Sequence, residues 1–84
     1  MKKIVVLISG QGRNLQALMD ACAAGKIPAQ IVKVISSKPD AGGLERARRA
    51  GLATEIVAHK NFDRRESFDA ALAAAMGEPD FVLL

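Results

Sequence analysis

The sequence is poor in aromatic residues, and this shortage argues against one class of binding protein. Its 84 residues include three Phe but no Tyr and no Trp. Proteins that bind single-stranded nucleic acids stack the bases on aromatic side chains, and such platforms are scarce here. The net charge of +3 is therefore weak evidence for nucleic acid, and we predict no nucleic-acid partner.

Cysteine is nearly absent as well. Cys22 is the only one, so no disulfide and no cysteine-based zinc site can form within the chain. This usage is typical of a protein kept in a reducing cytoplasm. We predict a cytoplasmic location, no metal, and a packing role for Cys22 as a small core residue.

Long hydrophobic runs are missing too. "IVVLI" at residues 4–8 follows two lysines, as in a secretion signal. The run is shorter than the roughly 7–15 residues of an export core, and glycines follow at once. We interpret it as a buried strand and expect no membrane partner. Because half of the residues are apolar and no segment is repetitive, the chain is predicted to be globular, with one domain at most.

The sequence does contain a regular alternation of strand and helix patterns. Runs of consecutive apolar, β-branched residues predict buried strands at 3–8, 29–36, 53–57 and 81–84. Between the first two lies a helix whose apolar stripe is Leu15, Leu18, Met19 and Cys22 and which ends near Gly25. A short helix over 44–51 is closed by Gly51.

A third helix is expected to open at Asp63. Glu66 lies three residues further on, which matches a capping box with aspartate as the cap. Its core stripe comprises Phe68, Leu72, Ala75 and Met76, and Gly77 and Pro79 end it. The order β-α-β-α-β-α-β predicts an α/β fold with an open parallel Rossmann-like sheet. Such sheets bind ligands at the carboxyl ends of their strands.

The last predicted strand, 81–84, ends the sequence inside an apolar run. A parallel strand this apolar is normally covered on both faces, and a bare edge strand favours aggregation. We therefore expect residues 1–84 to be the front part of a larger domain.

The loop between the first strand and the first helix, "ISGQGRN", is the candidate binding site. A glycine-rich turn at a helix start gathers backbone N–H groups and the positive end of the helix dipole, which suits an anion. Gly10 and Gly12 let a ligand approach the backbone, and Arg13 and Asn14 add side-chain donors. The alternative is a plain tight turn, in which glycine only reverses the chain.

Two familiar nucleotide motifs do not fit this loop. The dinucleotide fingerprint needs a third glycine where this chain has Leu15, and an acidic residue near the end of the second strand, where Ser36, Ser37 and Lys38 stand. A P-loop needs Gly-Lys-Ser/Thr, which does not occur. A monophosphate-sized site remains.

Three stretches resemble the amino-terminal half of the glycinamide ribonucleotide transformylases: "VVLISGQGRNLQALMDAC", "SSKPDAGGLERARRAGL" and "NFDRRESFDAAL". The match spans nearly all of the chain, with "ISGxGxN" and "GLERA" in the expected order. The resemblance implies a phosphoribosylglycinamide formyltransferase, which transfers a formyl group from 10-formyltetrahydrofolate to glycinamide ribonucleotide in de novo purine biosynthesis. It also implies that residues 1–84 are the phosphate-binding part of one formyltransferase domain.

The resemblance assigns the substrate's 5′-phosphate to Gly12, Arg13 and Asn14. The position of Arg13 is commonly Ser in the family, so an arginine fork would replace a hydroxyl donor there. Arg65 matches an arginine that reaches the glutamate tail of the folate, and Arg64 is the neighbouring candidate. Without the resemblance, Arg65 would be interpreted as a solvated arginine. The family's catalytic Asn, His and Asp have no counterparts here, and His59 is interpreted as a loop histidine.

Two other functions stay open from the sequence. One is a non-catalytic nucleotide- or phosphate-binding Rossmann-like module, which would fold by itself as 84 residues. The other is a related folate-dependent formyltransferase or deformylase, which would release formate or act on another amine. The oligomeric state is not determined by the sequence.

Overall fold

A computed structural model describes residues 2–83 of the chain, apart from the side chain of His59. Within these residues the strands form one sheet in the order β3-β2-β1-β4, and every pairing is parallel. The strands are β1 (Lys2–Ile8), β2 (Ala29–Ser36), β3 (Thr54–Ile56) and β4 (Phe81–Leu83). The predicted open parallel α/β sheet is confirmed; Leu84, in the predicted fourth strand, lies outside the described residues.

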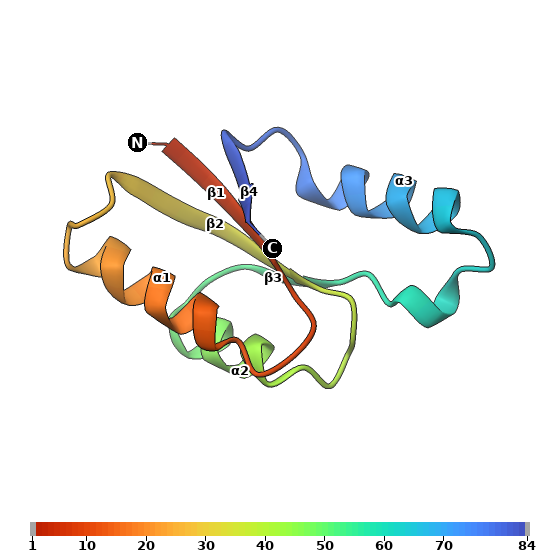
Figure 1. Ribbon diagram of the computed structural model, residues 1–84, viewed down its shortest axis with the longest axis horizontal. Helices are drawn as coiled ribbons and strands as arrows, with labels where there is room; N and C mark the ends of the chain where they lie inside the picture. Colours follow the sequence, from red (N-terminus) through yellow and green to blue (C-terminus); the bar gives the residue numbers. More distant parts are fainter. Residues whose placement is uncertain (1, 84) are drawn as a thin grey trace.

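The sheet lies between two layers of helices (Figure 1). One face is covered by α1 (Arg13–Ala23) and α2 (Gly42–Arg49), and the other face by α3 (Arg65–Met76). Side chains alternate along β1, so Ile4 and Val6 pack on the α1 and α2 side while Val5 packs on the α3 side. This alternation explains why the strand is apolar at consecutive positions, as the sequence indicated.

A register shift in β2 brings a charged residue onto the α3 side of the sheet. Ile4 pairs with Ile31 and Val5 with Lys33, so Val32 is an extra residue in β2. Lys33 Nζ lies 2.9 Å from Glu55 Oε1 on β3 and donates to the carbonyl of Ala75 at 2.9 Å. One side chain therefore ties two strands to the end of α3.

Helices α1 and α2 are each followed, two residues after their last residue, by the glycine expected from the sequence. Gly25 has φ +75° and Gly51 has φ +76°. In both cases the glycine N–H and the N–H after it bond back to carbonyls of the last helical turn. The second helix differs from its predicted range of 44–51, because it begins at Gly42 and ends at Arg49.

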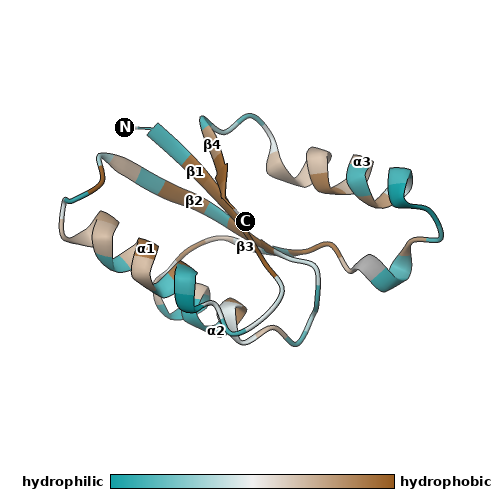
Figure 2. Ribbon diagram, viewed as in Figure 1, coloured by the Kyte–Doolittle hydropathy of each residue, from teal (hydrophilic) through white to brown (hydrophobic). Residues whose placement is uncertain are grey.

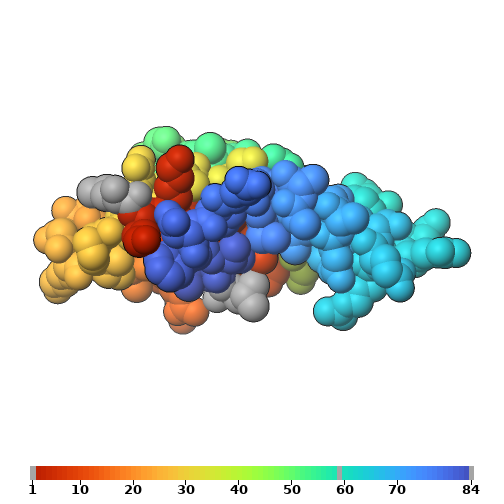
Figure 3. Space-filling view, turned by 90° about the horizontal axis from the view of Figure 1, so that it is seen from above, coloured from red at the N-terminus to blue at the C-terminus, as the bar shows by residue number. Residues whose placement is uncertain are grey.

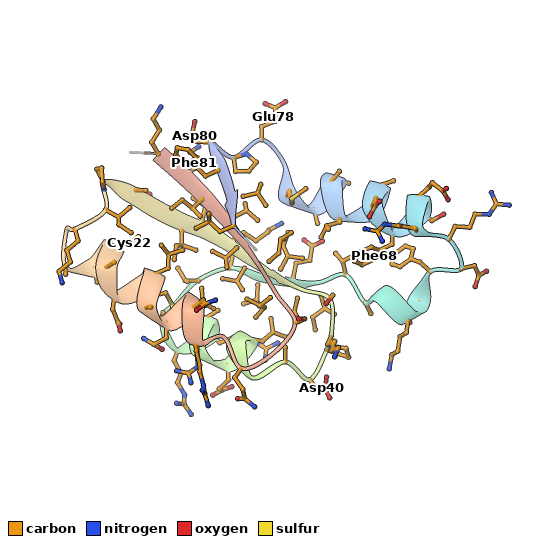
Figure 4. All side chains as sticks on the ribbon, viewed as in Figure 1. Cys22, Asp40, Phe68, Glu78, Asp80 and Phe81 are labelled. Carbon is orange, nitrogen blue, oxygen red and sulfur yellow. The ribbon has the colours of Figure 1, made fainter. Side chains whose placement is uncertain are left out.

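The predicted capping box at the start of α3 is wrong. The helix begins at Arg65, the residue before it is an extended Arg64, and no side chain caps the helix. A single turn of 3-10 helix, η1 (His59–Asn61), precedes it. The rings of Phe62 and Phe68 meet edge to face at 5.8 Å (Phe68 in Figure 4). This contact across the helix start determines where the chain enters α3, and it does not use Asp63.

β4 is an exposed edge strand. Phe81, Val82 and Leu83 are exposed by 52%, 41% and 39%. Figure 2 shows the strand as a brown, apolar segment, and Figure 3 shows the blue carboxyl-terminal residues on the surface beside the red residues of β1. The strand is anchored at its start, where the Asp80 carboxylate accepts the Lys3 N–H at 2.7 Å (Figure 4).

None of the helices within residues 2–83 is long and apolar enough to span a membrane.

Candidate functional site

A cleft opens at the carboxyl end of β1, next to the edge strand β4. Its volume is about 890 Å³. The walls are the loop of residues 9–12, the first turns of α1, and Leu83 of β4. This is the edge at which open parallel sheets bind their ligands, between two strands whose connections run to opposite faces of the sheet.

Residues with unpaired backbone N–H groups line this cleft. Helix α1 begins immediately after Gly12, and no side chain caps it. The N–H groups of Gly12, Arg13, Asn14 and Leu15 have no hydrogen-bond acceptor among the residues that the structure describes. Unpaired N–H groups at a helix start, with the positive end of the helix dipole, favour a bound anion.

The charge of the lining agrees with an anion. No Asp or Glu lies among the described residues that line the cleft, and its one charged lining residue is Arg13. The first turn of α1 likewise contains no acidic residue. Arg13 and Asn14 are both exposed. The structure therefore places the three predicted phosphate-binding residues, Gly12, Arg13 and Asn14, together on one lip of the cleft.

The reason for glycine at position 12 differs from the sequence interpretation. Gly12 has φ +76°, and a Cβ there would lie 2.6 Å from the Cα of Gly43. The missing side chain thus leaves room for helix α2. Backbone conformation and the packing of one backbone on another already require glycine at this position, and the approach of a ligand to Gly12 stays a prediction.

Gly10 is the glycine of the loop that neither packing nor backbone conformation requires. A Cβ at Gly10 would meet nothing within 4 Å, and its φ is not in the left-handed region. The residue is exposed and lines the cleft. Free approach of a ligand to the backbone is therefore a role that Gly10 can have without any competing structural demand.

The start of α2 supports the loop from behind, which the sequence analysis did not predict. The N–H of Gly43 donates to the carbonyl of Gly10 at 2.9 Å. Arg46 Nε donates to the carbonyl of Gln11 at 2.8 Å. The signal that could have indicated this was the glycine pair at 42 and 43, because paired glycines at a helix start allow close approach of another backbone.

The predicted folate-binding residue lies on another element. Arg65 is the first residue of α3 and does not line the cleft. Its side chain is 89% exposed, with Nε 3.8 Å from Asp69 Oδ2. Arg64, the alternative, is also exposed. The prediction for the His59 side chain lies outside the described residues, and among the described side chains no three His, Cys, Asp or Glu gather as metal ligands do.

A family model for formyl transferases matches residues 2–84. The chain belongs to the formyl transferase family.

Relatives within this family bear out the resemblance seen in the sequence. The chain is 52% identical over 83 residues to phosphoribosylglycinamide formyltransferase of Escherichia coli K12, which covers 96% of this chain and 39% of that protein. It is 53% identical over 72 residues to the protein of the same name from Haemophilus influenzae, covering 86% of this chain and 34% of the relative. The chain thus spans less than two fifths of the length of these relatives.

Solved structures agree on the fold. A glycinamide ribonucleotide transformylase from Symbiobacterium toebii superposes with a TM-score of 0.85 at 50% identity, over 90% of this chain and 36% of the other. A phosphoribosylglycinamide formyltransferase from Coxiella burnetii, solved in complex with CHES, gives a TM-score of 0.91 at 40% identity, over 96% and 39%. The Rossmann-like arrangement of this formyl transferase segment is therefore shared with them.

Proposed function

We propose that this chain is the phosphate-binding part of a phosphoribosylglycinamide formyltransferase. The observation that carries the proposal is the cleft at the end of β1, which residues 12–15 line with unpaired N–H groups and which has no acidic side chain in its described lining. An anion the size of a phosphate monoester suits these donors. The identity of 52% to a protein of that name supplies the substrate, glycinamide ribonucleotide.

In this proposal the 5′-phosphate of glycinamide ribonucleotide accepts hydrogen bonds from the backbone of Gly12 and from Arg13 and Asn14. The reacting amine lies at the far end of the substrate. Binding energy at the phosphate holds that amine in register and lowers the barrier for its reaction. The catalytic residues belong to the part of the relatives' length that this chain does not span.

The reaction is acyl transfer from 10-formyltetrahydrofolate. The substrate amine attacks the formyl carbon, a carbon–nitrogen bond to the amine forms, and the bond to the folate nitrogen breaks, releasing tetrahydrofolate. Polar groups stabilise the tetrahedral oxyanion and move the proton of the amine. Arg65, exposed at the start of α3, would contact the glutamate tail of the folate. We place the protein in the cytoplasm, with residues 1–84 belonging to a single domain.

A coupled assay tests this function in the protein that carries this chain. The protein is mixed with glycinamide ribonucleotide and 10-formyltetrahydrofolate, and tetrahydrofolate and formate are measured. Production of tetrahydrofolate that depends on glycinamide ribonucleotide, without formate, is the expected result. Formate released without the ribonucleotide would identify a deformylase, and phosphate binding without any turnover would identify a non-catalytic module.

A further inference from the structure

The "GLERA" stretch that supports the family resemblance contains an arginine that the proposed reaction does not use. Arg46 lies on α2, behind the loop, and is half-buried. Its Nε donates to the Gln11 carbonyl at 2.8 Å, and its Nη1 donates to Gln16 Oε1 at 3.3 Å. The side chain does not line the cleft. It therefore contacts the loop and the first helix without reaching the anion site itself.

Three consecutive peptide groups of the loop are held by their carbonyls. The Gly10 carbonyl accepts the Gly43 N–H at 2.9 Å, the Gln11 carbonyl accepts Arg46, and the Gly12 carbonyl accepts the Gln16 N–H at 2.9 Å. In a planar trans peptide the C=O and the following N–H point in opposite directions. The N–H groups of residues 11, 12 and 13 are thus turned away from these partners.

The bond from Arg46 is the one among these three that carries a charge. A hydrogen bond from a guanidinium to a carbonyl is stronger than one between neutral groups. It also polarises the peptide group, so the N–H of Gly12 on the other side becomes a better donor. In Figure 1 the loop between β1 and α1 passes beside the start of α2.

Resting on the proposed phosphate site, we infer that Arg46 is a positioning residue: its guanidinium holds the Gln11 peptide so that the N–H of Gly12 is aimed at the substrate's phosphate. Arg46 acts from the α2 side and the phosphate binds from the cleft side. The two never touch, and the loop backbone transmits the effect.

The test replaces Arg46 by Met, which keeps a long apolar stem and removes every donor. Arg49→Met is the matched control, because Arg49 lies on the same helix, carries the same charge and pairs with Glu45 at 3.2 Å on the exposed side. Inorganic phosphate is titrated into each protein, and the backbone N–H signals of residues 12–14 are followed by NMR. The expected result is affinity lowered about tenfold in Arg46→Met and unchanged in Arg49→Met.

Phosphate affinity in Arg46→Met equal to that of the unaltered protein would overturn the inference. An equal loss in Arg49→Met would also overturn it, since the effect would then be one of net charge. If the unaltered protein itself does not bind phosphate at these signals, the phosphate site fails and the inference with it. Normal binding in the unaltered protein together with normal binding in Arg46→Met rejects only the positioning role.

A readout without substitution covers the case in which Arg46→Met does not fold. The Nε–H signal of Arg46 in the unaltered protein should shift with the same saturation curve as the Gly12 N–H when phosphate is added, although this Nε–H bonds to Gln11 and not to phosphate. The Nε–H of Arg49 should stay unchanged. A stationary Arg46 signal while the Gly12 signal saturates would overturn the inference.

Discussion

At the residue scale, the glycines of this chain have different structural roles. Gly12 combines a φ of +76° with a backbone contact to Gly43, whereas Gly51 has the same φ of +76° and open space around it. Gly10 has neither constraint. Glycine is therefore present at these three positions for different reasons: backbone conformation, close packing and ligand approach. The sequence alone does not distinguish these reasons.

Alanine substitutions can measure these roles separately. Gly51→Ala should lower the free energy of unfolding by about 1–2 kcal/mol, the cost of a left-handed conformation for a residue with a Cβ. Gly12→Ala should cost more, because its Cβ would lie 2.6 Å from backbone at Gly43. Gly10→Ala should be within about 0.5 kcal/mol of the parent protein. Chemical denaturation gives all three; equal losses at positions 12 and 51 would contradict the packing role.

Arg13 is a second residue whose role can be measured. Its side chain is exposed and lines the cleft, so Arg13→Ala should leave stability unchanged. The binding free energy for glycinamide ribonucleotide should become weaker by about 1.5–3 kcal/mol if the guanidinium binds the phosphate, as proposed. Arg13→Ser should recover part of that loss through its hydroxyl. Isothermal titration measures both variants, and an Arg13→Ala variant that binds normally would leave the anion to the backbone donors and Asn14.

At the element scale, the start of α3 was predicted incorrectly because two local preferences compete there. Asp63 and Glu66 have the spacing of a capping box, but the contact between Phe62 and Phe68 lies across the same turn. Burial of two aromatic rings outweighs a cap of about 1 kcal/mol. The helix consequently begins without a side-chain cap, after an extended Arg64.

An uncapped helix start can be improved by substitution. Arg64→Asp should raise the free energy of unfolding by about 1 kcal/mol, because an aspartate there accepts unpaired N–H groups and complements the helix dipole. Asp63→Ala should be neutral. Thermal denaturation measures both changes, and a loss of stability in Asp63→Ala would indicate that Asp63 caps the helix in solution.

Lys33 provides a test of how α3 is attached. Its ammonium bonds to Glu55 and to the Ala75 carbonyl, each at 2.9 Å, with the side chain only 29% exposed. Lys33→Met should therefore lower the free energy of unfolding by about 1 kcal/mol and speed hydrogen exchange in the last turn of α3. Glu45→Gln is the control, since its exposed pair with Arg49 should contribute almost nothing. Equal effects would mean that Lys33 is merely another surface charge.

At the scale of the whole molecule, the described residues leave the β4 edge of the sheet without a neighbouring strand. Phe81, Val82 and Leu83 are exposed on the edge strand β4, and the cleft lies against the same edge. Unpaired, apolar edge strands pair with other chains.

The isolated 84-residue polypeptide should therefore self-associate. Sedimentation velocity at increasing concentration should show dimers or larger species, and Val82→Lys should shift them toward monomer by placing a charge on the edge. Lys2→Met, at the opposite end of the neighbouring strand, serves as a surface control. A polypeptide that stays monomeric at high concentration would show that this edge is protected in solution.

The sequence by itself determined the order of strands and helices, the parallel sheet and the loop that carries the candidate site. These follow from local signals: consecutive apolar residues in "KIVVLI", the stripe from Leu15 to Cys22, and glycines that end helices. Each of these signals involves residues that are close together in the sequence. The hydrophobic periodicity of each element and the glycines that end the helices can therefore be recognised without knowledge of the tertiary contacts.

Only the tertiary structure decided why Gly12 must be glycine and that Arg46 reaches the loop. Both depend on residues far apart in the sequence, Gly12 with Gly43 and Gln11 with Arg46. The start of α2 meets the loop that leads into α1 because α1 and α2 pack on the same face of the sheet. Packing of one backbone on another depends on three-dimensional distance, and no local pattern of residues encodes it.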